Sequence, residues 1–130
     1  MIKDVTRGLR AAIEKARKAG IPKSQLIIDP GIGFGKNFRQ NYELLQKLPE
    51  LAKLGYPLLV GTSRKGFLGA TLGRNGKPAP AAERIWGTAA TVTASILGGA
   101  HIVRVHDVAE MVQVARVADC LLVPQRLVHK

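Results

Sequence analysis

The chain has 130 residues, 46% of them apolar, so it can bury one core but is too short for a closed eight-stranded (β/α) barrel of roughly 250 residues. Lysine and arginine outnumber aspartate and glutamate by 20 to 9, and the net charge of +11 favours anionic ligands. The basic residues are scattered and only 5% of residues are aromatic, so we expect a phosphorylated small molecule rather than nucleic acid.

A single cysteine, Cys120, excludes an internal disulfide framework and is typical of a reducing compartment. It lies in an apolar helical pattern, which predicts an inert, buried thiol. Residues 1–4 lack the apolar core of a signal peptide. The longest weakly charged stretch, residues 85–100, is shorter than the ~20 residues of a membrane span and predicts a buried helix. We therefore expect a cytoplasmic protein with no membrane contact.

Helices and strands are expected to alternate as in a parallel α/β fold. The expected helices cover residues 4–19, 37–48, 49–55, 66–72, 81–97 and 108–122, and the expected strands cover residues 26–29, 58–60 and 101–105. Apolar residues at helical spacing indicate the helices, and the apolar run at 26–29 is typical of a strand buried on both faces. Asn37 should cap one helix, Pro49 should restart it, and Asp107 with Glu110 should form a capping box.

The last helix carries two apolar faces. One face consists of Val108, Met111, Val112, Ala115, Ala118 and Leu122, and the other of Val114, Val117 and Leu121. One face can cover the sheet, whereas the other would remain in water in a monomer. The pattern therefore predicts a homodimer that forms through the carboxyl-terminal helices.

Three of the apolar runs end in clusters of charged and glycine residues, namely Asp29–Lys36, Gly61–Gly66 and Arg104–Asp107. The clusters recur at about the length of one strand plus one covering helix. Because the carboxyl ends of parallel strands share one edge of a sheet, the three clusters should converge on one ligand.

The residue types in the clusters indicate what that ligand carries. Asp29 can accept two hydrogen bonds from an amidine-like edge, such as that of a guanine or a pterin. The alternating glycines that follow let the backbone approach a ligand but lack the spacing of the dinucleotide fingerprint. Lys65 precedes a short helix and can donate to a ring carbonyl or a phosphate. Arg104 and His106 alternate along a strand, point to one side and suit a pyrophosphate.

Each cluster also has a purely structural interpretation. Asp29 would then cap a helix or form a turn, and Ser63–Lys65 would be a solvated basic turn. Arg104 would pair with an acidic residue, and His106 would be hydrogen bonded within its own layer. His101 and His129 have no such neighbours and are expected to be structural or exposed to solvent. The sequence has no cysteine pair, no His-x-x-x-His and no paired carboxylates at ligand spacing, so we expect no metal site made by this chain alone.

At these residues the sequence resembles the carboxyl-terminal half of bacterial dihydropteroate synthases, folate-pathway enzymes that sulfonamides inhibit. The segments Leu26–Lys36, Tyr56–Gly69 and Gly98–Val108 carry the resemblance, in family-like order and spacing. It implies an α/β fold made of the last three strands of a TIM (β/α)8 barrel with their helices. Residues 1–130 would then be the carboxyl-terminal portion of a pterin-binding TIM-barrel domain.

The resemblance also implies a reaction. The family condenses p-aminobenzoate with 6-hydroxymethyl-7,8-dihydropterin pyrophosphate to give 7,8-dihydropteroate and pyrophosphate, with Mg²⁺ bound mainly through the substrate pyrophosphate. By resemblance, Asp29 binds the pterin, and Lys65 contacts the pterin and borders the aminobenzoate pocket. Phe34 and Ser63 help to form that pocket, and Arg104 and His106 hold the pyrophosphate. Gly33 and Arg64 complete the implied set of substrate-binding residues. The catalytic residues among them are Asp29, Lys65, Arg104 and His106.

The chain has no counterpart of the earlier strands, which in that family supply further pterin-binding residues and mobile loops. We therefore do not expect these 130 residues alone to turn over substrate. Two other functions stay open. One is a pterin-binding methyltransferase, which has no reason to keep Ser63–Lys65 and Arg104–His106 together for a pyrophosphate. The other is a non-catalytic fragment that self-associates and binds anions or a partner.

Overall fold

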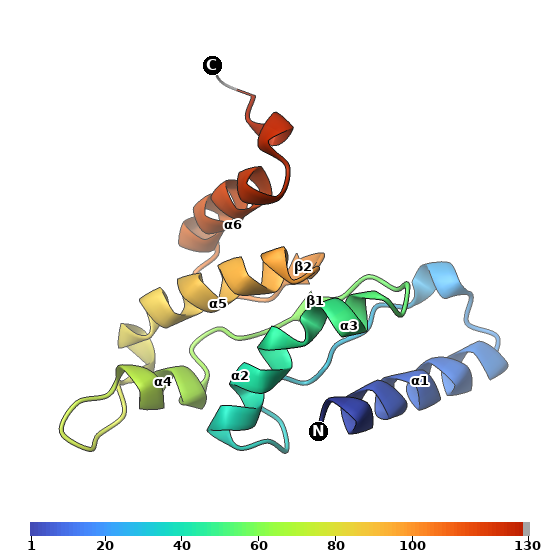
Figure 1. The fold of residues 1–130 in the computed structure, drawn as a ribbon, viewed down its shortest axis with the longest axis horizontal. Coiled ribbons are helices and arrows are strands. Elements are labelled where there is room, and N and C mark those ends of the chain that lie inside the picture. Colours follow the sequence, from blue (N-terminus) through green and yellow to red (C-terminus); the bar gives the residue numbers. More distant parts are fainter. Residues whose placement is uncertain (129–130) are drawn as a thin grey trace.

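The computed structural model describes residues 1–128, in which helices surround a small parallel sheet (Figure 1). The helices are α1 (Ile2–Lys18), α2 (Phe38–Gln46), α3 (Leu48–Ala52), α4 (Gly66–Leu72), α5 (Ile85–Leu97) and α6 (Val108–Leu122), and the strands are β1 (Leu59–Val60) and β2 (Ile102–Val103). Single 3-10 turns lie at Lys23–Gln25, Ala81–Glu83 and Pro124–Arg126. The predicted α/β alternation is confirmed.

Three chain segments run parallel at the centre of the molecule. β1 pairs with β2, with Leu59 opposite Ile102. The expected strand over 26–29 is reduced to one parallel bridge between Ile28 and Leu58. The prediction that this strand is buried on both faces is wrong, since Ile28 is buried but Ile27 is 55% exposed. Successive side chains of an extended segment point to opposite faces, and only the face that carries Ile28 packs against the larger apolar cluster.

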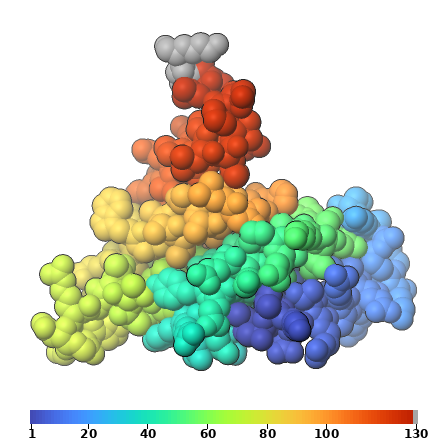
Figure 2. Space-filling model, in the orientation of Figure 1, coloured from blue at the N-terminus to red at the C-terminus, as the bar shows by residue number. Residues whose placement is uncertain are grey.

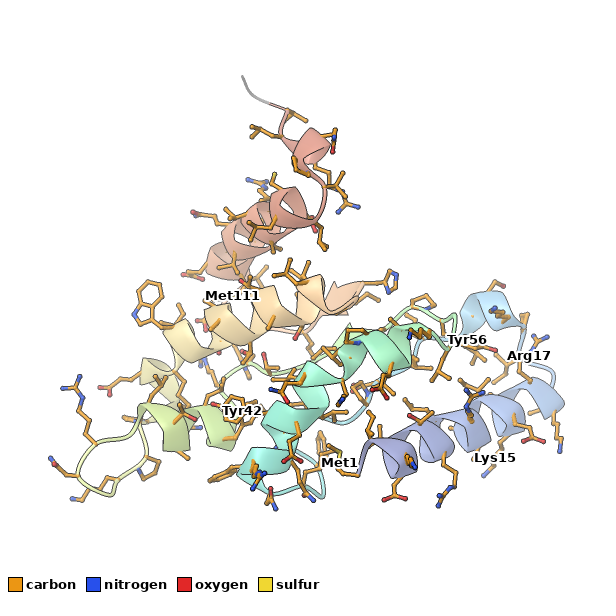
Figure 3. The ribbon with its side chains drawn as sticks, in the orientation of Figure 1. Met1, Lys15, Arg17, Tyr42, Tyr56 and Met111 are labelled. Atoms are coloured by element: carbon orange, nitrogen blue, oxygen red, sulfur yellow. The ribbon has the colours of Figure 1, made fainter. Side chains whose placement is uncertain are left out.

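Two apolar clusters stabilise this arrangement. The larger one consists of Ile28, Ile32, Leu44, Leu45, Leu48, Leu51, Leu58, Val60, Phe67 and Leu68. The apolar stripe of α1 packs against it, while Lys15 lies on the outer side of that helix (Figure 3). The smaller cluster joins α5 to α6 and includes Val92, Ile96 and Met111. The first cluster thus supports the ends of the parallel segments.

The helix termini follow local sequence signals. Asn37 accepts a hydrogen bond from the Gln40 N–H (2.8 Å), and the Gln40 side chain accepts one from the Asn37 N–H (3.0 Å), which confirms the predicted cap. Pro49 lies in the first turn of α3, as predicted. The predicted buried helix begins at Ile85 rather than residue 81, because a 3-10 turn precedes α5.

The last helix departs from the prediction. α6 packs on α5 and projects from the body of the molecule, instead of covering the sheet (Figure 2). Met111 and Ala118 are buried against α5, whereas Val117 and Leu121 are 64% and 62% exposed. Cys120, expected to be buried, is half-buried. The apolar face predicted to meet another subunit therefore lies at the surface.

The remaining sequence-based expectations concern the histidines and the membrane. His101 is exposed, and its Nδ1 accepts a hydrogen bond from the Leu58 N–H (3.2 Å). His129 lies outside the described residues. Across residues 1–128, no helix has both the length and the apolar character needed to cross a membrane.

Candidate functional site

A cavity of about 280 Å³ opens where the three parallel segments end. It is lined by Asp29, Ile32, Phe34, Leu59, Gly61, Ser63, Lys65, Arg104, Val105 and His106. All three of the charged clusters therefore contribute side chains to it, which confirms the predicted convergence. Of the eight expected substrate-binding residues, Gly33 and Arg64 are absent from the lining.

The loop after Ile28 is closed by its own polar groups. Asp29 accepts a hydrogen bond from the Gly31 N–H (2.8 Å). Lys36 donates to the carbonyls of Gly31 and Phe34, each at 2.8 Å. Burial lowers the pKa of Lys36, and the nearby charge of Asp29 opposes that shift. Asp29 thus stands on a preformed turn at the cavity rim.

Gly33 takes part indirectly. Its φ of +86° is a left-handed conformation that favours glycine, and its N–H donates to the buried side chain of Asn41 (2.8 Å). A Cβ at this position would lie 3.0 Å from Cδ of Lys65, so Gly33 leaves the space that the lysine occupies. Asn41 supports the loop that borders the cavity, and the sequence does not single it out. The sequence signal that could have identified Asn41 is a polar residue on the buried face of α2, beside Leu44 and Leu45.

Lys65 and Phe34 both line the cavity and contact each other. The Lys65 Nζ lies 4.6 Å from the centroid of the Phe34 ring, within the range of a cation–π contact. The ring is 68% exposed. A flat ligand could therefore meet an aromatic ring and a cation together.

Ser63 holds the imidazole of His106. Its buried Oγ lies 2.6 Å from His106 Nδ1 and accepts a hydrogen bond from the His106 N–H (3.0 Å). This leaves Nε2 as the ring nitrogen that can meet a ligand. The Arg104 N–H donates to the Val60 carbonyl (3.1 Å), which extends the pairing of β1 and β2. Both Arg104 and His106 line the cavity, as their alternation predicted.

Arg64 lies outside the cavity, contrary to the expectation that it binds substrate. Its Nη2 donates to Oδ1 of Asp107 at 2.8 Å and its Nε to Oδ2 at 3.3 Å. This hydrogen bonding raises the pKa of Arg64 and lowers the pKa of Asp107. The predicted capping box of Asp107 and Glu110 is also wrong, since the Asp107 carboxylate binds Arg64 and makes no cap hydrogen bond.

The site combines one carboxylate with several cationic or donor groups. Asp29 stands at one strand end, and Lys65, Arg104 and His106 stand at the other two. Within residues 1–128, no three His, Cys, Asp or Glu side chains gather closely enough to hold a metal ion. The arrangement suits a ligand with N–H donors at one end and a multiply charged anion at the other.

The family model described as "Pterin binding enzyme" matches residues 1–106, which are most of the chain, so the chain belongs to the pterin-binding enzymes. Individual relatives are dihydropteroate synthases. That of Synechocystis sp. is 50% identical over 121 residues, which are 93% of this chain and 40% of the relative.

Solved structures agree with this assignment. The dihydropteroate synthase of Clostridium difficile, determined in the presence of pteroic acid, superposes with a TM-score of 0.86 at 42% identity, over 92% of this chain and 44% of that one. The Yersinia pestis enzyme in a sulfonamide complex gives a TM-score of 0.87 at 40% identity, over 93% and 42%. The chain thus spans less than half the length of these relatives.

Proposed function

We propose that the chain is the carboxyl-terminal part of a dihydropteroate synthase and that its three parallel segments are the last three strands of a TIM (β/α)8 barrel. The observation that carries this proposal is the single cavity shared by Asp29, Lys65, Arg104 and His106. The enzyme would condense p-aminobenzoate with 6-hydroxymethyl-7,8-dihydropterin pyrophosphate, as part of folate biosynthesis.

Asp29 binds and stabilises the pterin in this proposal. Its carboxylate accepts hydrogen bonds from the amino and ring N–H groups of the pterin. When the C–O bond to the pyrophosphate breaks, the electron pair leaves with the pyrophosphate and a methylene cation conjugated with the pterin ring remains. A fixed carboxylate stabilises that cation more than it stabilises the neutral substrate, which accelerates the step.

Arg104 and His106 hold the pyrophosphate. Ser63 holds the His106 imidazole before substrate arrives, and the backbone of Arg104 is fixed by its hydrogen bond to the Val60 carbonyl. Their donors stabilise the charge that collects on the leaving group. The aniline nitrogen of p-aminobenzoate then forms the new C–N bond and releases a proton to solvent.

Lys65 and Phe34 border the aminobenzoate pocket. Their cation–π pair offers an aromatic face for the benzoate ring beside a donor that can reach the pterin. Ser63 contributes through His106, to which it is hydrogen bonded. The relatives solved with pteroic acid and with a sulfonamide support a site of this kind and make the chain a proposed sulfonamide target.

Mg²⁺ is a proposed cofactor, bound mainly through the oxygens of the substrate pyrophosphate. When bound there it would act as a Lewis acid on the leaving group. Among residues 1–128, no three carboxylate, imidazole or thiolate side chains gather to hold it, so the substrate would supply most of its ligands.

We further propose a cytoplasmic homodimer that forms through the carboxyl-terminal helices. The exposed valines and leucines of α6 support this proposal, since isolated apolar faces of that kind are commonly covered by another subunit. Sedimentation of the chain tests it. A monomer at high micromolar concentration would contradict it.

The decisive experiment uses a chimera in which this chain replaces the matching 121 residues of the Synechocystis enzyme. We expect pyrophosphate release that depends on p-aminobenzoate. Asp29→Asn should weaken pterin pyrophosphate binding about 10- to 100-fold, the range for losing a charged hydrogen bond. Asp4→Asn, on the exposed face of α1, makes the same change in charge and should have no effect.

Two results would contradict the proposal. One is unchanged affinity in Asp29→Asn, measured by calorimetry. The other is methyl transfer from a folate without pyrophosphate release, which would identify a pterin-binding methyltransferase instead.

A further inference from the structure

Alternate residues of the loop between β1 and α4 face opposite directions. Gly61, Ser63 and Lys65 line the cavity. Thr62 and Arg64 turn away from it and bind other elements. The loop therefore has an inner set of residues that can meet a ligand and an outer set that fixes where the inner set lies.

The outer residues are anchored to α5 and to the residue before it. The Thr91 hydroxyl donates to that of Thr62 at 2.8 Å, and both residues are buried. The Arg64 N–H donates to the Thr88 hydroxyl at 3.1 Å, and the Arg64 carbonyl accepts from Nη1 of Arg84 at 2.8 Å. Both backbone polar groups of Arg64 are thus bound to side chains.

The Arg64 side chain completes the anchoring by pairing with Asp107. Asp107 directly follows His106, just as Arg64 directly follows Ser63. Two links therefore join the same pair of loops side by side: Ser63 to His106 on the cavity side, and Arg64 to Asp107 on the outer side. Each spans 43 residues of sequence. Two adjacent links restrain rotation as well as separation.

The Arg64 backbone indicates that this position is constrained. Its φ is +56°, a left-handed conformation that costs a residue other than glycine roughly 1 kcal/mol or more. Such a conformation persists only where the surroundings hold it. Here the surroundings are Thr88, Arg84 and Asp107. The turn at Arg64 directs the next residue, Lys65, back toward the cavity.

We propose that Arg64 and Asp107 are positioning residues, whose ion pair holds the loop of Ser63 against the loop of His106, so that Arg104 and His106 can bind one pyrophosphate. Neither residue touches the ligand. The identity of that ligand rests on the proposed function, whereas the positioning role requires only that the cavity bind a pyrophosphate group. Small displacements of binding groups weaken such sites strongly, because the donors must converge on the same oxygens.

The proposal makes a prediction opposite in sign to that of simple electrostatics. Asp107→Asn removes a negative charge near an anion site, and Coulomb's law alone predicts tighter pyrophosphate binding. If Asp107 instead positions the site, the variant binds pyrophosphate more weakly. We expect about a tenfold loss, within the usual coupling between contacting residues.

The experiment measures binding of inorganic pyrophosphate to the 130-residue chain by calorimetry. The variants are Arg64→Gln, Asp107→Asn, the double variant, and the swapped pair Arg64→Asp with Asp107→Arg. Both single variants should lose affinity about equally, the double variant should lose no more than either, and the swapped pair should recover most of it. Aspartate tolerates the left-handed conformation at position 64. Asp119→Asn breaks another arginine pair, with Arg126, and should change nothing.

The outcomes separate the two proposals. If the pyrophosphate affinity of Asp107→Asn stays equal to that of the parent or rises, the positioning role is overturned. An additive loss of affinity in the double variant also overturns it, because Arg64 would then be a direct ligand. If Asp107→Asn does not fold by circular dichroism, Asp107→Glu is measured instead, and an unchanged affinity in that longer variant also counts against positioning. If the chain binds pyrophosphate but the chimera does not bind the pterin pyrophosphate, only the proposed function is contradicted. A chain that binds no pyrophosphate overturns both.

Discussion

Replacing Gly69 with alanine tests the hydrogen bonds that Arg84 makes to the loop of Arg64, because Gly69 leaves open the space that the Arg84 guanidinium occupies. Gly69 is buried in α4. A Cβ at this position would lie 2.5 Å from Nε of Arg84 and 2.6 Å from its Cζ, far inside van der Waals contact. The guanidinium would have to leave, and its hydrogen bonds to the carbonyls of Ala79 and Arg64 would be lost.

The expected magnitude follows from two opposing effects. Alanine in a helix interior is better than glycine by about 1 kcal/mol. Each hydrogen bond from a charged donor contributes about 1.5–3 kcal/mol, and both bonds of Arg84 are partly buried. The lost bonds therefore outweigh the gain in helix propensity. We expect Gly69→Ala to lower the free energy of unfolding by about 2 to 5 kcal/mol, equivalent to a fall in Tm of roughly 8 to 20 °C.

The assay is urea unfolding followed by far-UV circular dichroism, with two controls. Gly8→Ala is the same substitution in α1, where a Cβ meets nothing within 4 Å, and it should stabilise the chain by up to about 1 kcal/mol. In an Arg84→Ala background the clash is absent, so Gly69→Ala should change from destabilising to neutral or stabilising. A Gly69→Ala chain as stable as the parent would refute the reasoning, and so would an equal loss in the two backgrounds.

Three further predictions concern the rest of the structure. Asn41→Ala leaves the N–H of Gly33 without its buried acceptor and should lower the free energy of unfolding by about 1 to 3 kcal/mol in urea titrations. We expect a matching loss of pterin affinity. If stability and affinity are both retained, the loop keeps its conformation without Asn41. Pairing with Arg64 lowers the Asp107 pKa below 3.8, so the stabilisation is present above pH 3.8 and is lost as the pH falls through the folded-state value. The urea midpoints of the parent and Asp107→Asn should therefore differ at pH 7 and converge in strong acid, and a constant difference would contradict this. Leu44→Ala, at a fully buried position, should cost about 2 to 5 kcal/mol of unfolding free energy, and a loss below 1 kcal/mol would mean that the cluster repacks.

Features set by neighbouring residues could be predicted from the sequence alone. Asn37 caps its helix, Pro49 restarts the next one, and α4 covers the predicted residues Gly66–Leu72. Each depends on interactions within a few positions along the chain. The convergence of Asp29 with the later clusters was also predictable, because parallel strands place their carboxyl ends at one edge whatever the details of packing.

Only the tertiary structure distinguishes Arg64 from Lys65 or assigns a partner to Asp107. Adjacent basic residues look alike in sequence, and an aspartate before a helix is typical of a cap. The ion pair joins positions 43 residues apart, so no local pattern contains it. The sequence also could not predict that α6 would pack on α5 instead of the sheet. A helix with two apolar faces can pack against several neighbours, and the rest of the fold decides which neighbour it contacts.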